Sequence, residues 1–292
     1  MSARPAGASP VVAAAVEGLR APVIRALGLH SGWGRGAAAL PAEARVAASG
    51  RRVLSLGRPE ALDARYAGDR FRRATRECLW ALASVEAMLE DGEAAREAIE
   101  GDGTALVFVT AAVYAASNRA FVEGGGGRGT HFAYTAPAVV PAEVAIEFGL
   151  TGPSTVFIGG PPATLHGIWY AATLLAEGAC DRALVLAVET FTECEDLYAR
   201  ARRLTGGPLV EAAGCLWLEP GAGTIALRPA GASRAAGAAI RARVGETFAC
   251  EPLAAIAAWR HRGAREPLTL EGRWRGASTV LQWQDGQETA GG

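Results

Sequence analysis

The residues that could carry chemistry gather at one turn, where an apolar stretch runs through glycines into a helix-like pattern. Val156-Phe157-Ile158 is the apolar stretch, and Gly159-Gly160-Pro161-Pro162 is the turn. A strand that ends at a helix N-terminus is a common mount for a nucleophile, because the unpaired amides there stabilise an anion or lower a thiol pKa. None of the four turn residues has a nucleophilic side chain. The sequence therefore has the turn of an enzyme without its reactive atom.

The helix-like pattern after the turn holds two further polar side chains, Thr164 and His166. His166 lies about one helical turn into the pattern, so it could point toward a site. A histidine at such a position more often belongs to a core or an interface. Thr164 has no recognisable base partner, which favours a structural hydroxyl. Both residues are weak candidates for chemistry.

The cysteines show no spacing typical of a metal site, and we interpret them as reduced thiols of a cytosolic protein. The histidines show no mutual spacing that suggests a metal either, so no metal is expected. None of the thiols is a good candidate for a nucleophile. The five cysteines are Cys78, Cys180, Cys194, Cys215 and Cys250.

The residues around the turn resemble the β-ketoacyl synthases of the thiolase superfamily. Gly152-Pro153-Ser154 precedes the turn, as it does in that family, and Gly178 to Glu189 follows its pattern "Gly-x-x-Asp-x-Ala-Leu-Val-x-x-x-Glu". The segment from Pro141 to Pro153 is similar to the one that leads to the family's nucleophile strand. Matching these motifs without a gap places the nucleophilic cysteine of the family at Pro161.

The resemblance covers residues 22–228 and implies a fold and a domain organisation. The expected fold is α/β and thiolase-like, with a mainly parallel sheet packed between helices, as in the N-terminal half of a ketosynthase. Residues 1–21 are expected to form a flexible tail. Residues 229–292 are too few for the second half of the family and contain neither of its histidine motifs. They are expected to form a short C-terminal extension.

Hydrophobic periodicity predicts several elements along the chain. Arg70–Glu90 has the apolar stripe of an amphipathic helix. Thr104–Val109 is a continuous apolar run, typical of a strand that is buried on both faces. Ala213–Pro220 and Thr224–Arg228 read as the two strands of a hairpin. A second helix is expected at Glu251–Arg262. A further strand is expected at Ser278–Trp283.

Composition and charge exclude several classes of protein. Half of the 292 residues are hydrophobic and the formal net charge is −1, which suits an ordinary soluble protein. This balance gives no support to nucleic-acid binding. No segment approaches the ~18 consecutive apolar residues of a membrane span. We therefore expect a cytoplasmic protein that binds neither nucleic acid nor membrane.

The resemblance implies a role in pairing. Ketosynthase relatives without a nucleophile include the chain-length factors of type II polyketide and aryl-polyene-like pathways, which pair with an active enzyme and shape its acyl tunnel. Proteins of this superfamily dimerise through the strand before the nucleophile turn, here Val156-Phe157-Ile158. The expected partners are a full-length β-ketoacyl synthase and an acyl carrier protein. The carrier's phosphopantetheine would hold the substrate, and no cofactor is expected for this chain itself.

Two alternatives remain open at the level of sequence. One is an independent acyl-thioester hydrolase or acyltransferase that uses Thr164, His166 or a cysteine. The other is a homodimeric protein that binds acyl groups or a carrier protein without catalysis. A run of arginines could receive the acidic surface or the phosphate of a carrier protein. This run consists of Arg70, Arg72, Arg73 and Arg76.

Overall fold

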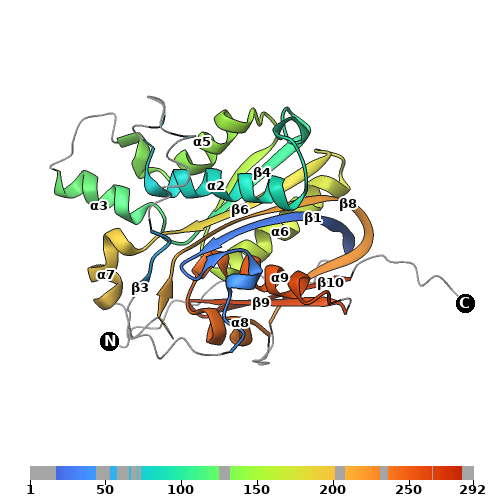
Figure 1. Ribbon diagram of the computed structural model, residues 1–292. Helices are drawn as coiled ribbons and strands as arrows, with labels where there is room; N and C mark the ends of the chain where they lie inside the picture. Colours follow the sequence, from blue (N-terminus) through green and yellow to red (C-terminus); the bar gives the residue numbers. More distant parts are fainter. Residues whose placement is uncertain are drawn as a thin grey trace, which may run out of the picture.

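A mixed β-sheet organises the described part of the chain (Figure 1). The computed structural model describes residues 18–43, 53–57, 66, 71, 74–124, 132–200, 208–230, 236–264 and 266–284. Six strands follow the order β2-β1-β8-β6-β4-β5, and β10 and then β9 continue from β8. Their bounds are β1 (Leu19–Ser31), β2 (Gly34–Arg35), β4 (Thr104–Thr110), β5 (Ser154–Ile158), β6 (Arg182–Glu189), β8 (Ala212–Pro229), β9 (Leu268–Trp274) and β10 (Ala277–Gln284). A separate pair joins β3 (Val53–Leu54) to β7 (Leu209–Val210).

Four of the main strands run in one direction. β4 pairs in parallel with both β5 and β6. β8 pairs antiparallel with β6 on one side and with β1 on the other, so β1 has the same direction as β4, β5 and β6. The parallel part arises because helices carry the chain back across the sheet between these strands. The expected α/β arrangement of a sheet between helices is confirmed. The pairings of β4 with β5 and β6 are parallel, but the other pairings among the described strands of this sheet are antiparallel, so the sheet is mixed rather than mainly parallel.

Helices cover both faces of the sheet. Figure 1 shows α2 and α5 on one face and α6 and α9 on the other. Every residue of β4 is buried, as the apolar run predicted. The helices are α2 (Arg76–Asp91), α3 (Ala115–Glu123), α5 (Val139–Phe148), α6 (Pro161–Ala176), α7 (Glu195–Arg200), α8 (Ala236–Val244) and α9 (Glu251–His261).

Helix α2 differs from its prediction at its start and in its burial. The helix was expected from Arg70, but Thr75 is extended and α2 begins at Arg76. Residues Arg70, Arg72 and Arg73 lie outside the described residues. The apolar stripe predicted one buried face, whereas twelve of the sixteen residues are buried. The reason is that this helix packs against α5 as well as against β1, β8 and β6 of the sheet.

The predicted hairpin at 213–228 is wrong, because β8 is one strand of 18 residues. Pro220 and the glycines beside it have the composition of a turn, but the strand only bends there. β1 is irregular opposite the bend, with register shifts between Ala21 and Val23. A Cβ on Gly221 would lie 2.4 Å from the Ala21 carbonyl oxygen, so the two bending backbones need glycine to approach.

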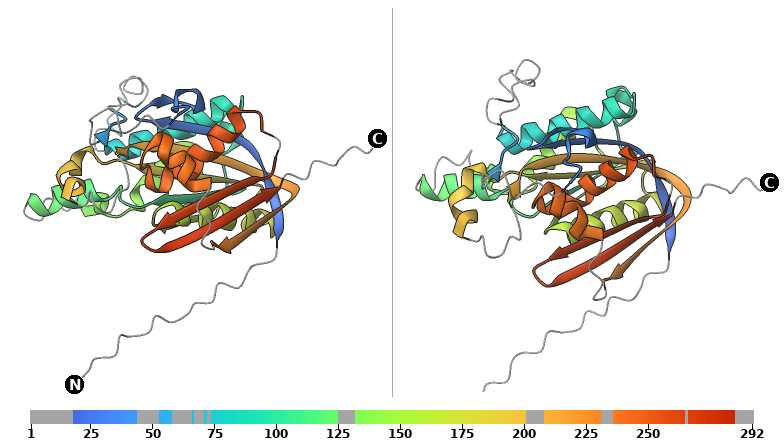
Figure 2. Two further views of the ribbon diagram at one scale, coloured as in Figure 1. Left: turned by 90° about the horizontal axis from the view of Figure 1, so that it is seen from below. Right: turned by 60° about the horizontal axis from the view of Figure 1, so that its bottom comes forward.

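The C-terminal residues complete the same core. β10 pairs with the second part of β8, and β9 pairs with β10. Figure 2 shows this β9–β10 hairpin lying against α6, which packs between it and the main sheet. At the other end of the chain, β1 begins at Leu19, inside the segment expected to be a tail, because Leu19 pairs with Ile225.

Candidate functional site

The turn after β5 is built as the sequence predicts. β5 ends at Ile158, the Gly159 N–H donates to the Thr110 carbonyl over 2.9 Å, and α6 begins at Pro161. Two prolines suit the first turn of α6, because amides there have no partner within the helix. Pro161 and Pro162 are both buried. The strand, turn and helix therefore stand at the carboxyl edge of the parallel strands, where α/β proteins bind ligands.

The β9–β10 hairpin covers this turn. A Cβ on Gly160 would lie 2.5 Å from two ring carbons of Trp274. A Cβ on Gly272 would lie 2.7 Å from the Pro161 carbonyl carbon and from the Pro162 nitrogen. Real Cβ atoms do not approach heavy atoms so closely. The Trp274 ring and the β9 backbone are therefore in direct contact with the turn.

Three aromatic rings, each in contact with the next, extend from the β9–β10 hairpin to the residue after β6. Trp274 meets Phe248 edge to face with ring centroids 4.7 Å apart, and Phe248 meets Phe191 at 5.0 Å. Phe248 precedes α9 and has a φ of 47°, a left-handed conformation that bulky residues rarely adopt. Phe191 follows β6 and is fully buried. The rings thus connect the C-terminal residues to the end of β6.

Glu189 lies buried beside the turn, at the carboxyl end of β6. Its carboxyl group accepts backbone N–H groups of Ala111 at 2.5 Å, Ala112 at 3.2 Å and Ala249 at 3.3 Å. Thr110 lies 3.4 Å away through its hydroxyl. Burial raises the pKa of Glu189 to about 8, although the surrounding amides oppose the rise. This carboxyl group joins the end of β4 to the C-terminal residues.

The two weak candidates for chemistry are both engaged in local bonds. The Thr164 hydroxyl is fully buried and donates to the Ala249 carbonyl over 2.6 Å. His166 is exposed on α6, and its Nδ1 lies 2.7 Å from the Pro162 carbonyl. All five cysteines are buried, and burial raises their pKa values. Among the described residues, none acts as an activating base for Thr164 or for a cysteine, and the His166 Nδ1 faces its own helix.

β5 forms the edge of the main sheet, since β4 is its partner among the described residues. Pro153 accepts a bond from the Leu106 N–H, and Gly159 donates one to Thr110. Backbone groups alternate along a strand, so the odd-numbered residues face β4 and the backbones of Val156 and Ile158 face outward. The Ile158 side chain is 51% exposed. Phe157 is half-buried and packs against Tyr170 at 5.9 Å.

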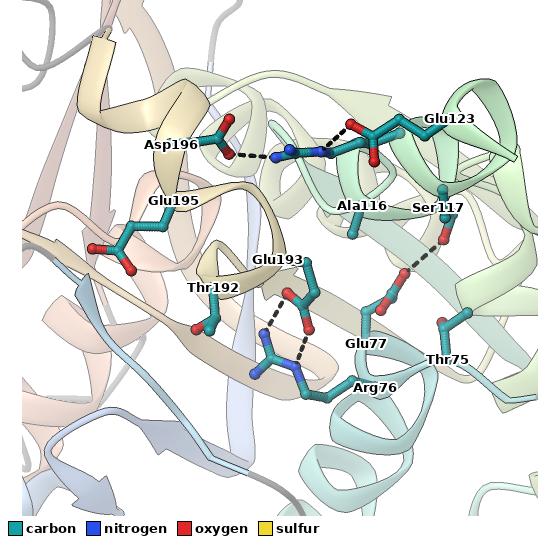
Figure 3. Close-up of a pocket in the computed structure, with 12 residues that line it drawn as sticks. Thr75, Arg76, Glu77, Ala116, Ser117, Glu123, Thr192, Glu193, Glu195 and Asp196 are labelled. Atoms are coloured by element: carbon teal, nitrogen blue, oxygen red, sulfur yellow. Dashed lines mark hydrogen bonds and ion pairs between the residues drawn. The ribbon is translucent and has the colours of Figure 1, made fainter.

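A cleft of about 630 Å³ lies between α2, α3 and α7 (Figure 3). Its charged side chains pair largely with one another. Figure 3 shows the Arg76 guanidinium facing Glu193, with bonds of 2.5 and 2.7 Å, and the buried Glu77 accepting the Ser117 hydroxyl at 3.1 Å. Arg119 binds Glu123 and Asp196. Arg76 is therefore committed to partners within this chain rather than displayed for a carrier protein.

Glu211 binds both Arg76 at the start of α2 and the residues that follow β6. It is fully buried at the start of β8 and receives two Arg76 nitrogens at 2.7 Å each. It also accepts the N–H groups of Phe191 at 2.6 Å and Thr192 at 2.8 Å. Burial alone would raise the pKa of Glu211, but the Arg76 bonds and charge, together with these amides, hold it at about 2.

Sequence reasoning missed both buried carboxyl groups, Glu189 and Glu211. A usable signal existed, because each acidic residue lies at the end of an apolar strand or directly beside one.

Among the described residues, no group of three His, Cys, Asp or Glu side chains is arranged to hold a metal ion. Within the same ranges, no helix has the length and apolar character to cross a bilayer.

Comparison with known proteins identifies the family. Residues 33–205 match the β-ketoacyl synthase, N-terminal domain. The match covers more than half of the chain, so the protein belongs to this family. The matched residues lie within the range 22–228 that carried the resemblance. Among curated proteins, none matches the sequence.

Solved structures share the fold at low sequence identity. A type II polyketide synthase acyl carrier protein in complex with its ketosynthase, AntDE:AntF, matches with a TM-score of 0.71 and 13% identity, over 91% of this chain and 99% of that chain. The ishigamide ketosynthase/chain length factor matches with a TM-score of 0.68 and 16% identity, over 91% and 99%. The ketosynthase ApeO with its chain length factor ApeC from Xenorhabdus doucetiae matches with a TM-score of 0.52 and 14% identity, over 73% and 79%. The predicted thiolase-like fold is confirmed.

Proposed function

We propose that this chain is a non-catalytic ketosynthase-like subunit that pairs with an active β-ketoacyl synthase and shapes the acyl tunnel of that partner. The observation that carries the proposal is the combination at one place of an open strand edge and a turn without a nucleophile. β5 presents outward-facing backbone groups and the exposed Ile158. The next residues, Gly159 to Pro162, offer no reactive side chain.

An open, partly apolar edge favours strand addition. Unpaired N–H and C=O groups on an edge strand form a template for a second strand, and a protein that keeps such an edge generally covers it. The similar structures include ketosynthases in complex with a chain length factor or a carrier protein. These complexes support a ketosynthase as the partner that covers β5, in an assembly served by a carrier protein.

The substrate would remain on the partner's side. Ketosynthase chemistry needs a nucleophile with an activating environment, and the resemblance assigns that position to Pro161. The substrate would be an acyl chain on the phosphopantetheine of an acyl carrier protein, delivered to the active subunit. Polyketide or fatty-acid-type synthesis, including aryl-polyene-like pathways, is the proposed context.

The test uses proline substitutions in β5. Val156→Pro removes an N–H that faces the open edge, so no bond to β4 is lost and the chain still folds. Phe157→Pro removes an N–H that faces β4 and should destabilise the chain itself. Each variant is co-expressed with a full-length β-ketoacyl synthase, and the products are separated by size-exclusion chromatography with mass detection.

We expect a one-to-one complex with the parent chain and loss of that complex with Val156→Pro. Circular dichroism confirms in the same experiment that the Val156→Pro chain is folded. A stable homodimer of this chain with no affinity for the synthase would overturn the proposal in favour of homodimeric binding. Undiminished complex formation by folded Val156→Pro would show that β5 is not the interface.

A further inference from the structure

The C-terminal residues reach over the degenerate turn from two directions. The β9–β10 hairpin brings Trp274 onto Gly160 and the β9 backbone at Gly272 onto Pro161. The residues before α9 bring Phe248 edge to face against that tryptophan ring, with an interplanar angle of 68°. Each element comes from the part of the chain that follows β8.

Two bonds hold the second of these elements in place. The Ala249 N–H donates to the buried Glu189 carboxyl group, and the Ala249 carbonyl accepts the Thr164 hydroxyl. Glu189 stands at the end of β6, and Thr164 lies in the first turns of α6. Ala249 is therefore bonded both to α6, which follows the turn, and to the end of β6. These bonds also hold Phe248 in its left-handed conformation, which costs free energy when nothing compensates for it.

We propose that Phe248, Ala249 and Trp274 form a built-in plug that closes this chain's own turn, so that the turn acts as a solid wall and does not receive an acyl group or an electrophile. The meaning of the plug rests on the proposed function, because a partner that shapes another subunit's tunnel needs no acyl site of its own. The contacts that make the plug lie within this chain and need no partner.

The plug predicts that a restored nucleophile remains unreactive. Pro161→Cys places a thiol under the hairpin, and iodoacetamide labelling followed by mass spectrometry of the intact chain measures its accessibility. The background is low, because the native cysteines are buried. His166→Cys serves as the matched control, since this position is exposed on the next turn of the same helix.

We expect Pro161→Cys to be labelled at least about 100-fold more slowly than His166→Cys, because labelling must wait for local opening. Trp274→Ala in the Pro161→Cys chain should restore labelling to within about 10-fold of the control, while leaving the rate of His166→Cys unchanged. Trp274→Phe should give an intermediate rate and carries the comparison if Trp274→Ala does not fold.

Two results would overturn the proposal. Labelling of Pro161→Cys as fast as His166→Cys would show that the turn is open. Slow labelling of Pro161→Cys that stays equally slow after folded Trp274 variants are introduced would show that something other than the plug closes the turn. The labelling is read on this chain, alone or in complex, so its failure is distinct from a failure of pairing.

Discussion

Replacing Glu211 by glutamine should disconnect three parts of the fold at one point. The carboxylate of Glu211 receives Arg76 from the start of α2 and the amides of Phe191 and Thr192 from the residues after β6. Glutamine keeps the size of the side chain but removes its charge and turns one acceptor into a donor. The Arg76 side chain, only 15% exposed, would keep Glu193 as its remaining carboxylate.

The size of the effect follows from the pKa of Glu211. That pKa lies at about 2, below the ordinary value of 4.5. Each pKa unit corresponds to about 1.4 kcal/mol, so the ionised form contributes about 3 kcal/mol to the free energy of unfolding at pH 7. Breaking a buried ion pair from one side costs about 3–5 kcal/mol in other proteins, which agrees. Because the folded-state pKa is lowered, this stability is present above pH 4.5 and is lost as the pH falls toward 2.

Urea unfolding at pH 7, 4 and 3 tests this reasoning. Glu211→Gln should lower the free energy of unfolding by about 3 kcal/mol at pH 7, and the difference from the parent should shrink as the pH falls. Glu193→Gln is the control, since that carboxylate binds the same arginine but is 38% exposed, and should cost at most about 1 kcal/mol. A Glu211→Gln difference that is independent of pH, or no larger than that of Glu193→Gln, would refute it.

Two further predictions concern the surroundings of the turn. Burial raises the pKa of Glu189 to about 8, so the folded parent still holds a proton that the unfolded chain has lost. The free energy of unfolding of the parent should therefore fall as the pH rises from about 5 to 8. Urea titrations of the Glu189→Gln chain should show a pH dependence that is smaller by up to about 1.4 kcal/mol per pH unit. An equal pH dependence of the parent and the variant would contradict the raised pKa of Glu189. Gly160→Ala should cost about 1–3 kcal/mol, because its methyl group would meet the Trp274 ring. In a Trp274→Ala chain the same change should cost much less, and full additivity would speak against the contact.

Local patterns predicted the central fold well because those elements obey their own periodicity. The apolar run at Thr104–Val109 became a fully buried strand, and the prolines after Gly160 marked the start of α6. The predicted helix Glu251–Arg262 corresponds to α9. In each case the residues that form the element also determine its burial, so a single segment of sequence contains the needed information.

Other features depend on partners far away in the chain, which periodicity does not report. Pro220 and Gly221 look like a turn, yet β1 lies alongside and keeps β8 extended through the bend. Trp274 looks like an ordinary strand residue until the fold sets it on Gly160. Glu211 is acidic and would be assigned to the surface, whereas Arg76 makes its burial tolerable. The turn between β5 and α6 was predictable from sequence, but the residues that cover it were not.

The position of β8 has a consequence for how the chain is synthesised. β8 lies between β1 and β6 in the sheet but is the last of the three to leave the ribosome. Ala21 must wait for Gly223, about 200 residues later, before it can pair. Such distant pairings make folding slow and leave strand edges open to aggregation in the meantime. The yield of folded chain should therefore depend on how long the edges of β1 and β6 stay open before β8 is made.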